Sequence, residues 1–189
     1  MYFTHAFKIC PEFITTRVGQ ATLLTKLDKY LRICNFNYGA TLLSVFGAIF
    51  DTEFEKETTL LFEKIALRQI RCVYSSLTES ELTNAPERVR NFFQNLPDEF
   101  KEKVLVTPSA LKLAQTYVDE KVVGETSLDD CIHIATATLN KVDMLVSWNF
   151  KHIVNIYRIR GYNSINLRLG YGTLEIHSPK EIVNNENEE

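Results

Sequence analysis

The sequence predicts an α/β fold of three layers, in which a parallel sheet is flanked by helices. Short apolar runs alternate with helical patterns in the order β-α-β-α-α-β-α-α-β, and strands separated by helices favour parallel pairing. The 189 residues are enough for one domain with a substantial core. The composition, 45% hydrophobic and 24% charged, is ordinary for a soluble globular protein.

The first predicted strand follows a turn that ends at Gly39. Residues 41–50, TLLSVFGAIF, form an apolar run, which predicts a buried strand that leaves the sheet through a turn at Gly47. Residues 52–69 then show apolar side chains at helical spacing, with charged residues on the other face. An earlier amphipathic helix is expected at 21–34, where leucines recur at the same spacing.

Two further strands are expected in the middle of the chain, at 72–75 and 104–106. The helices around them are expected from about 78 to Pro86, over 87–95, and from Thr107-Pro108 to about 120.

The most informative block is 127–155, SLDDCIHIATATLNKVDMLVSWNFKHIVN. It predicts a helix over 128–140 capped by Ser127, a short buried strand at 144–147, and a polar turn at Trp148-Asn149. A carboxylate at a helix start that faces a polar group at a strand end is how an open α/β sheet forms a site. The remaining predictions are strand-like pieces at 164–167 and 173–176, a helical turn at Pro179, and a disordered polar tail at 184–189.

Bulk properties exclude several classes of protein. The net charge of −3 gives no global basic field that would attract nucleic acid, although a local basic surface is compatible with it. The chain has no apolar run of about 18 residues and no signal-peptide pattern, so we expect a cytoplasmic protein without a membrane partner. The four cysteines form no C-x-x-C pair, which favours buried or incidental thiols.

Two acids are candidates for chemistry. Glu81 and Asp130 each lie near a predicted helix start, where the partial positive charge of the helix favours the ionised form. Two or three convergent carboxylates can bind Mg²⁺ or Mn²⁺, which can activate a phosphodiester for hydrolysis. The alternative is structural, because Thr78-x-x-Glu81 and Ser127-x-x-Asp130 both fit a capping pattern.

Neighbouring polar residues leave similar alternatives open. Asn149 could orient a water or a phosphate, or it could be a turn residue that satisfies its own backbone. His133, one turn beyond Asp130, is expected to be a core histidine or a partner of an acid rather than a metal ligand. His152 is expected at the surface, near the rim of the site.

A basic segment follows the 144–147 strand. Residues 144–174 contain no Asp or Glu, and their candidates for RNA contact are Lys151, Arg158 and Arg160. The interleaved tyrosines 157, 162 and 171 could stack on unpaired bases. The alternative is a solvated basic face with structural tyrosines.

These segments resemble a known family. The 127–155 block, GYNSINLRLGYGTLEIHSPKEIV at 161–183, SLTESELTNAP at 76–86 and SVFGAIFDTEFEKET at 44–58 are similar to PIN-domain proteins related to VapC toxins. In particular they resemble a subgroup that contains the motif SWNFKHIVN. The resemblance covers about residues 44–183, and its motifs are long and specific.

The resemblance implies a fold and an activity. Family members have a parallel sheet flanked by helices, and they are typically Mg²⁺- or Mn²⁺-dependent ribonucleases. Many are toxins of toxin–antitoxin systems, so a cognate antitoxin and a homodimer are expected partners alongside single-stranded or structured RNA. By position, Glu81 and Asp130 match two family acids and would be metal ligands, and Asn149 stands where many members have a fourth acid.

One position departs from the family pattern. Family members have a first strand like Y-I-D-T-S-V-F-G, whose Asp is the central metal ligand, whereas this chain has Leu42 in that register. We therefore expect an atypical N-terminal extension over 1–40, a PIN-like domain over 41–183 and a tail over 184–189. Three functions remain open: a ribonuclease that is active, weakened or inactive, a non-catalytic PIN-fold binding module or degenerate gene product, and an interaction protein whose acids only cap helices.

Overall fold

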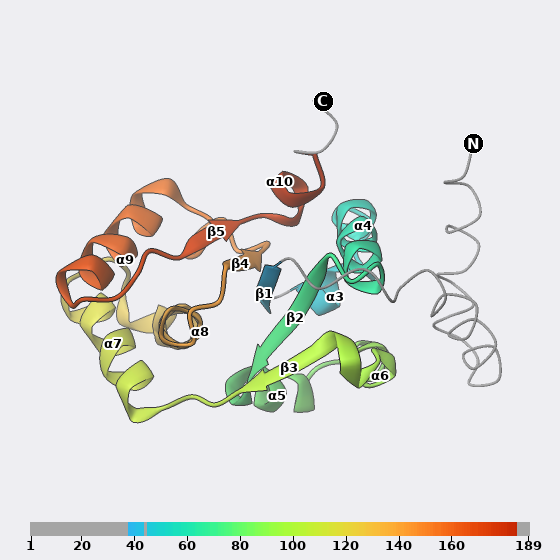
Figure 1. Cartoon of the computed structure of the whole chain (residues 1–189), viewed down its shortest axis with the longest axis horizontal. Coiled ribbons are helices and arrows are strands. Elements are labelled where there is room, and N and C mark those ends of the chain that lie inside the picture. Colours follow the sequence, from blue (N-terminus) through green and yellow to red (C-terminus); the bar gives the residue numbers. More distant parts are fainter. Residues whose placement is uncertain (1–37, 44, 185–189) are drawn as a thin grey trace.

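The computed structural model describes residues 38–43 and 45–184, and these residues confirm the predicted α/β fold (Figure 1). Within them, five parallel strands form one sheet in the order β3-β2-β1-β4-β5. The strands are β1 (Tyr38–Leu43), β2 (Ile70–Ser75), β3 (Lys101–Val104), β4 (Met144–Ser147) and β5 (Glu175–His177). The helix expected at 21–34, most of the expected extension over 1–40 and residues 185–189 of the expected tail lie outside the described residues.

Helices occupy every connection between the strands. Their bounds, in chain order, are α3 (Val45–Ala48), α4 (Glu55–Ala66), α5 (Ser76–Thr83), α6 (Glu87–Asn95), η1 (Asp98–Phe100), α7 (Pro108–Asp119), η2 (Glu125–Ser127), α8 (Leu128–Leu139), α9 (Ile156–Arg168) and α10 (Pro179–Asn184). Across residues 38–43 and 45–184, none of these helices combines the length and the apolar character needed to cross a lipid bilayer.

Two apolar cores lie on the two faces of the sheet. Helices α7, α8 and α9 cover one face, and α3, α4 and α10 lie on the other (Figure 1). Consecutive residues of β4 serve both cores, because Leu145 packs with the first set and Val146 with the second, and both are fully buried. This alternation explains why a strand that is buried on both faces has a continuous apolar sequence.

Several helix starts are fixed by side-chain caps. The Ser75 hydroxyl accepts a hydrogen bond from the Thr78 N–H at 3.1 Å, and Thr78 completes the capping box of α5 by accepting from the Ser75 N–H. Thr107 accepts from the Ala110 N–H at 3.2 Å, with Pro108 at the first position of α7, as the sequence predicted. These caps satisfy backbone donors that have no partner inside the helix.

The apolar run at 41–50 was wrongly predicted as one strand. Strand β1 ends at Leu43, and Val45–Ala48 form the short helix α3, of which Val45 and Phe46 are buried in the second core. The strand also begins earlier, because Tyr38 already pairs with Ile70 of β2. Residues 38–40, which the sequence assigned to the segment before the domain, therefore belong to the central strand.

Two other predicted strands differ from the structure. The third strand is Lys101–Val104 rather than 104–106, and its charged sequence suits an edge strand that faces solvent. Residues 164–167 lie inside α9, where Ile165 and Asn166 are buried. Asn155 starts this helix by accepting hydrogen bonds from two backbone N–H groups, a cap that the sequence reading missed.

A buried polar network joins the three helices of the first core. The Tyr117 hydroxyl of α7 donates to the Asn166 Oδ1 of α9. The Asn166 amide in turn donates to the Thr138 hydroxyl of α8 at 3.3 Å. Tyr117 and Asn166 are both fully buried. The network therefore fixes α7 and α9 against α8, the helix that contains Asp130 and His133.

We expect Tyr117→Phe to destabilise the fold by about 1–3 kcal/mol, because it leaves the buried Asn166 Oδ1 without its donor. Urea denaturation monitored by circular dichroism measures this change. Tyr157→Phe is the matched control, since Tyr157 is 80% exposed and the same substitution there should change the free energy of unfolding by less than about 0.5 kcal/mol. Equal stability of the two variants would contradict the role given to the network.

Candidate functional site

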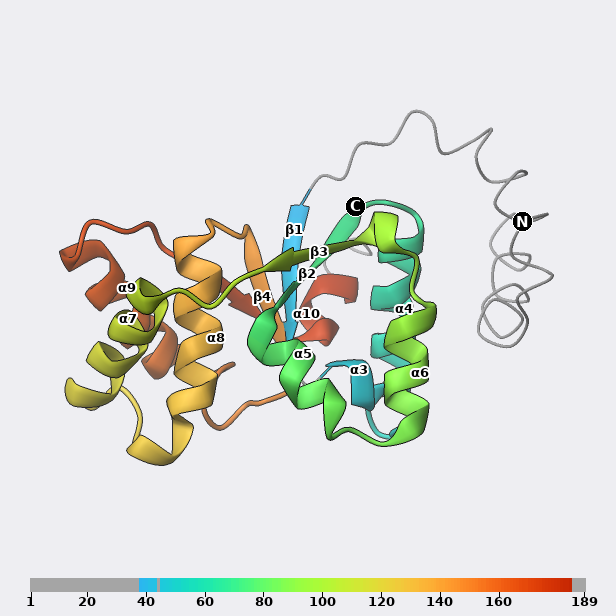
Figure 2. The same ribbon diagram turned by 90° about the horizontal axis from the view of Figure 1, so that it is seen from below.

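The carboxyl ends of β1 and β4 form the topological switch point of the sheet. From β1 the chain crosses to β2 on one side, whereas β4 pairs on the other side and leads to β5. Crossovers that diverge in this way leave a crevice at the carboxyl ends of the two strands, where open α/β sheets bind ligands. In Figure 2 the downstream end of β1, the start of α8 and the segment after β4 lie along the same edge.

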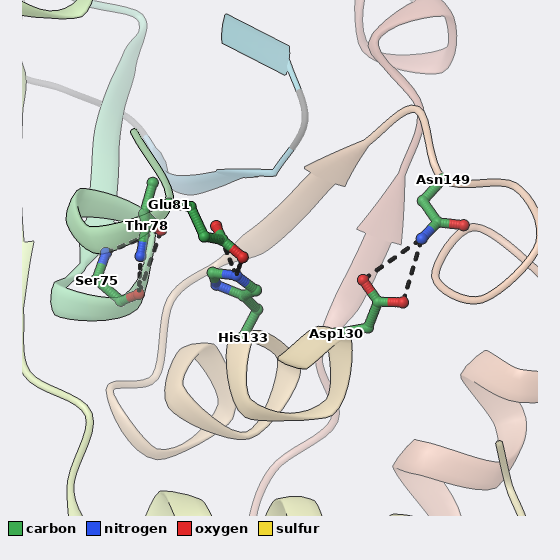
Figure 3. A network of polar contacts seen from close by, with 6 residues as sticks. All are labelled: Ser75, Thr78, Glu81, Asp130, His133 and Asn149. Carbon is green, nitrogen blue, oxygen red and sulfur yellow. Dashed lines mark hydrogen bonds and ion pairs between the residues drawn. The ribbon is translucent and has the colours of Figure 1, made fainter. Parts of the chain in front are cut away.

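Asp130 and Asn149 meet at this edge (Figure 3). Asp130 lies in the first turn of α8, and Asn149 follows β4 by two residues. The Asn149 Nδ2 donates to both carboxylate oxygens, at 3.2 and 3.4 Å. Its Oδ1 accepts the N–H of His152 at 3.0 Å. Because each end of the amide has a matching partner, the orientation of Asn149 and the position of the Asp130 carboxylate are both defined.

Glu81 contacts His133 one helical turn further along α8. The His133 Nε2 lies 3.0 and 3.1 Å from the two Glu81 carboxylate oxygens (Figure 3). An ionised carboxylate only accepts hydrogen bonds, so Nε2 is the donor. His133 is buried, whereas the Glu81 side chain is 49% exposed. His133 is thus a buried partner of an acid, as the sequence analysis expected, and it positions Glu81 from α8.

The capping interpretation is wrong for both acids. The capping box of α5 consists of Ser75 and Thr78, which places Glu81 in the second turn of the helix rather than at its start. At α8, the Ser127 side chain forms no capping hydrogen bond. Within the described residues, neither acid accepts a hydrogen bond from the backbone at the start of its helix. Glu81 instead contacts His133, and Asp130 contacts Asn149.

Burial raises the pKa of Asp130 above its ordinary value. His152, His133 and the Asn149 hydrogen bond oppose this effect, and the nearby Glu81 charge adds to it. The ionised carboxylate is therefore less stable here than in water, even though Asn149 contacts both of its oxygens. A perturbed acid at a switch point is a candidate for function, because a bound cation would remove the unfavourable energy.

The described residues contain no complete metal site. In the described part of the chain, no three His, Cys, Asp or Glu side chains are grouped so that they could bind a metal ion. Position 42 lies in β1 beside Val146 of β4, one residue before the strand ends, and leucine there supplies no ligand. Glu81 and Asp130 supply carboxylate oxygens, the ligands that Mg²⁺ and Mn²⁺ prefer, and a cation held by two carboxylates alone would keep several waters.

A pocket that was not predicted from the sequence lies next to this site. A cavity of about 310 Å³ is lined by Gly47, Ala48, Asp51, Phe54, Trp148 and Asn149. Its two walls follow β1 and β4, so it lies at the same switch point. The signal was present in the sequence, because Asp51 directly follows the first apolar run and Trp148-Asn149 directly follow the 144–147 strand.

The basic segment divides into exposed and structural residues. Lys151 and Arg160 are exposed. The Arg158 guanidinium instead donates to the Val122 carbonyl at 2.7 Å and joins α9 to the end of α7. Tyr162 is fully buried, so the expectation that it could stack on a base is wrong, whereas Tyr157 is 80% exposed.

We expect Asp130→Asn to stabilise the folded protein at neutral pH. The pKa of Asp130 is raised in the folded state, whereas in the unfolded chain it has the ordinary value of 3.8. The contribution of this carboxyl to stability is therefore most favourable below pH 3.8 and is lost as the pH rises through the raised pKa of the folded state. Asparagine does not ionise, so the difference in Tm should be small at pH 3 and largest at pH 7 in thermal unfolding. Asp129→Asn, at an exposed neighbour, is the control. A variant that melts below the native chain at pH 7 would refute this electrostatic assignment.

Comparisons with known proteins find similarity among solved structures. No protein-family model matches the chain, and no curated protein matches it either. Among solved structures, the crystal structure of VapBC2 from Rickettsia felis bound to a DNA fragment from their promoter is similar to this chain. The TM-score is 0.46 with 14% sequence identity, and the match covers 74% of this chain and 98% of the other.

Proposed function

We propose that this chain is a PIN-type ribonuclease that depends on Mg²⁺ or Mn²⁺ and has weakened activity. The observation that best supports it is the Asp130 carboxylate, which is half-buried at the switch point and has a raised pKa. The Asn149 amide contacts both of its oxygens. The sequence resemblance supplies the reaction class, because similar PIN-domain proteins hydrolyse RNA.

The residues have distinct roles in this proposal. Asp130 and Glu81 would bind the cation, which would polarise a phosphodiester and activate a water. Asn149 keeps the Asp130 carboxylate in one orientation, and His133 does the same for Glu81. An aspartate at position 149 would repel the Asp130 carboxylate at hydrogen-bonding distance, so the neutral amide of Asn149 avoids this repulsion when no cation is bound. The amide also supplies one less negative charge to attract a cation.

Leucine at position 42 is the reason to expect weak activity. Two carboxylates bind Mg²⁺ more weakly than three, and the shell would need water and substrate phosphate to be complete. The same observation favours a second candidate function, a non-catalytic PIN-fold module that binds RNA. Lys151 and Arg160, both exposed, could then neutralise phosphates. By resemblance, a cognate antitoxin and a second copy of the chain are further proposed partners.

Cleavage of single-stranded RNA in Mn²⁺ tests the proposal. We expect Leu42→Asp to raise the cleavage rate at least about tenfold, because an added carboxylate ligand contributes more than about 1.4 kcal/mol to binding the cation and the transition state. Leu42→Asn is the matched neutral control and should gain less. Asp130→Asn should abolish cleavage in both backgrounds, whereas Asp129→Asn should not. If Leu42→Asp gains nothing and Asp130→Asn loses nothing, the site is assigned to the wrong residues.

Binding of Mn²⁺ should stabilise the fold through the same acids. Ligand at 100 times its dissociation constant stabilises a protein by about 2.7 kcal/mol, so added Mn²⁺ should raise the Tm of the native chain and raise it further in Leu42→Asp. The shift should disappear in Asp130→Asn and decrease in Glu81→Gln. A shift that is unchanged in both variants would place Mn²⁺ binding at other residues, and a shift absent from all chains would favour an interaction protein without a metal site.

A further inference from the structure

The cavity beside Asp130 has the size and the walls of a site for a flat ring. Its volume of about 310 Å³ is at the lower end for ligand pockets, which suits one ring system rather than a larger molecule. Phe54 and Trp148 form its aromatic wall, with ring centroids 4.6 Å apart and planes tilted by 34°. Gly47 also lines the pocket, and the space beside it is open, because a Cβ at this position would meet no atom within 4 Å.

The aromatic wall has a fixed orientation. The Trp148 Nε1 donates to the hydroxyl of Thr58 at 3.0 Å, and Thr58 is fully buried in α4. The exposed ring of Phe150 also contacts the Trp148 ring in an edge arrangement, with centroids 6.0 Å apart and planes at 60°. A ring that is held in place loses little entropy when a base stacks on it, and aromatic stacking is how proteins bind unpaired RNA bases.

Asp51 gives the pocket a polar group of defined character. Its Oδ1 accepts the Glu53 N–H at 3.0 Å, which orients the carboxylate. Within the described residues its Oδ2 accepts no hydrogen bond. A carboxylate only accepts, so it selects a ligand edge that donates. Guanine presents two adjacent N–H donors on one edge, whereas uracil presents a single N–H between two oxygens that a carboxylate would repel.

We propose that this pocket, formed by Gly47, Asp51, Phe54 and Trp148, binds an unpaired guanine of single-stranded RNA. The inference rests on the proposed ribonuclease function and gives that site a base preference. Asn149 connects the two, because it lines the pocket and also hydrogen bonds to Asp130. The carboxylate of Asp51 makes the pocket less suited to the apolar side chain of a protein partner.

The single tryptophan of the chain makes binding directly measurable. Trp148 fluorescence is titrated in EDTA, so that no cleavage occurs, with a uracil tetranucleotide that contains one guanine and with an all-uracil tetranucleotide. We expect the guanine-containing RNA to quench the fluorescence and to bind about tenfold more tightly, as a hydrogen bond to a charged group contributes about 1.5–3 kcal/mol. Asp51→Asn should reduce this preference to less than about threefold, since the amide keeps the Glu53 contact and loses the charge.

Filling the pocket provides the matched steric test. Gly47→Leu should abolish quenching by the guanine-containing RNA, whereas Gly124→Leu should leave it unchanged, because a Cβ at Gly124 also meets open space but lies away from the pocket. Circular dichroism melts establish that both variants are folded. Equal quenching by the two RNAs, or quenching that survives Gly47→Leu in a folded protein, overturns the proposal.

The two proposals fail separately. If cleavage in Mn²⁺ depends on Asp130 but no guanine-dependent quenching occurs, the guanine-pocket proposal is rejected and the ribonuclease proposal is supported. If guanine-dependent quenching occurs but neither the native chain nor Leu42→Asp cleaves RNA, the guanine-pocket proposal is supported and the ribonuclease proposal is rejected. Quenching by an apolar peptide but by neither RNA assigns the pocket to a protein partner and overturns the guanine proposal.

Discussion

The pairing of β1 on both of its edges is the constraint on which the rest of the structure depends. Thr41 pairs with Val73 of β2 on one side and with Leu145 of β4 on the other, both in parallel. The Gly39 N–H also donates to the Asp143 carboxylate at 2.6 Å, which ties the start of β1 to the turn before β4. Since β1 joins both halves of the sheet, its position determines where the crevice opens and which helix starts face it.

The sequence predicts the fold well where its signals are local. The strand at 144–147 and the helix at 87–95 match the structure, because their apolar spacing and their flanking residues agree. The run at 41–50 could not be divided correctly, since an apolar run has the same composition in a buried strand and in a buried helical turn. The bounds of β3 could not be predicted from its own sequence, because they depend on which of its residues pair with β2, the strand beside it.

The sequence predicts which residues belong to the candidate site, but it does not predict which of their side chains contact one another. Strand and helix order predicted a site where the start of the 128–140 helix faces Asn149, and the family resemblance added Glu81, but the spacing of both acids also fitted helix caps. Two facts decide between a cap and a site. Ser75 rather than Thr78 is the N-cap residue of α5, and the acids have hydrogen-bond partners on other elements, namely His133 for Glu81 and Asn149 for Asp130. Such partners are distant in sequence and become neighbours only through the crossover between β3 and β4.

The interactions that hold Trp148 and the helices of the first core in place do not involve the acids. Trp148 is attached to Thr58, and Tyr117 and Asn166 hold α7 and α9 against α8. Asp130 even opposes folding when it is ionised. Substitution of either acid would therefore leave these interactions in place. A lineage that carries this fold could replace Glu81 or Asp130 and keep its architecture, so that the scaffold remains available for a new binding role.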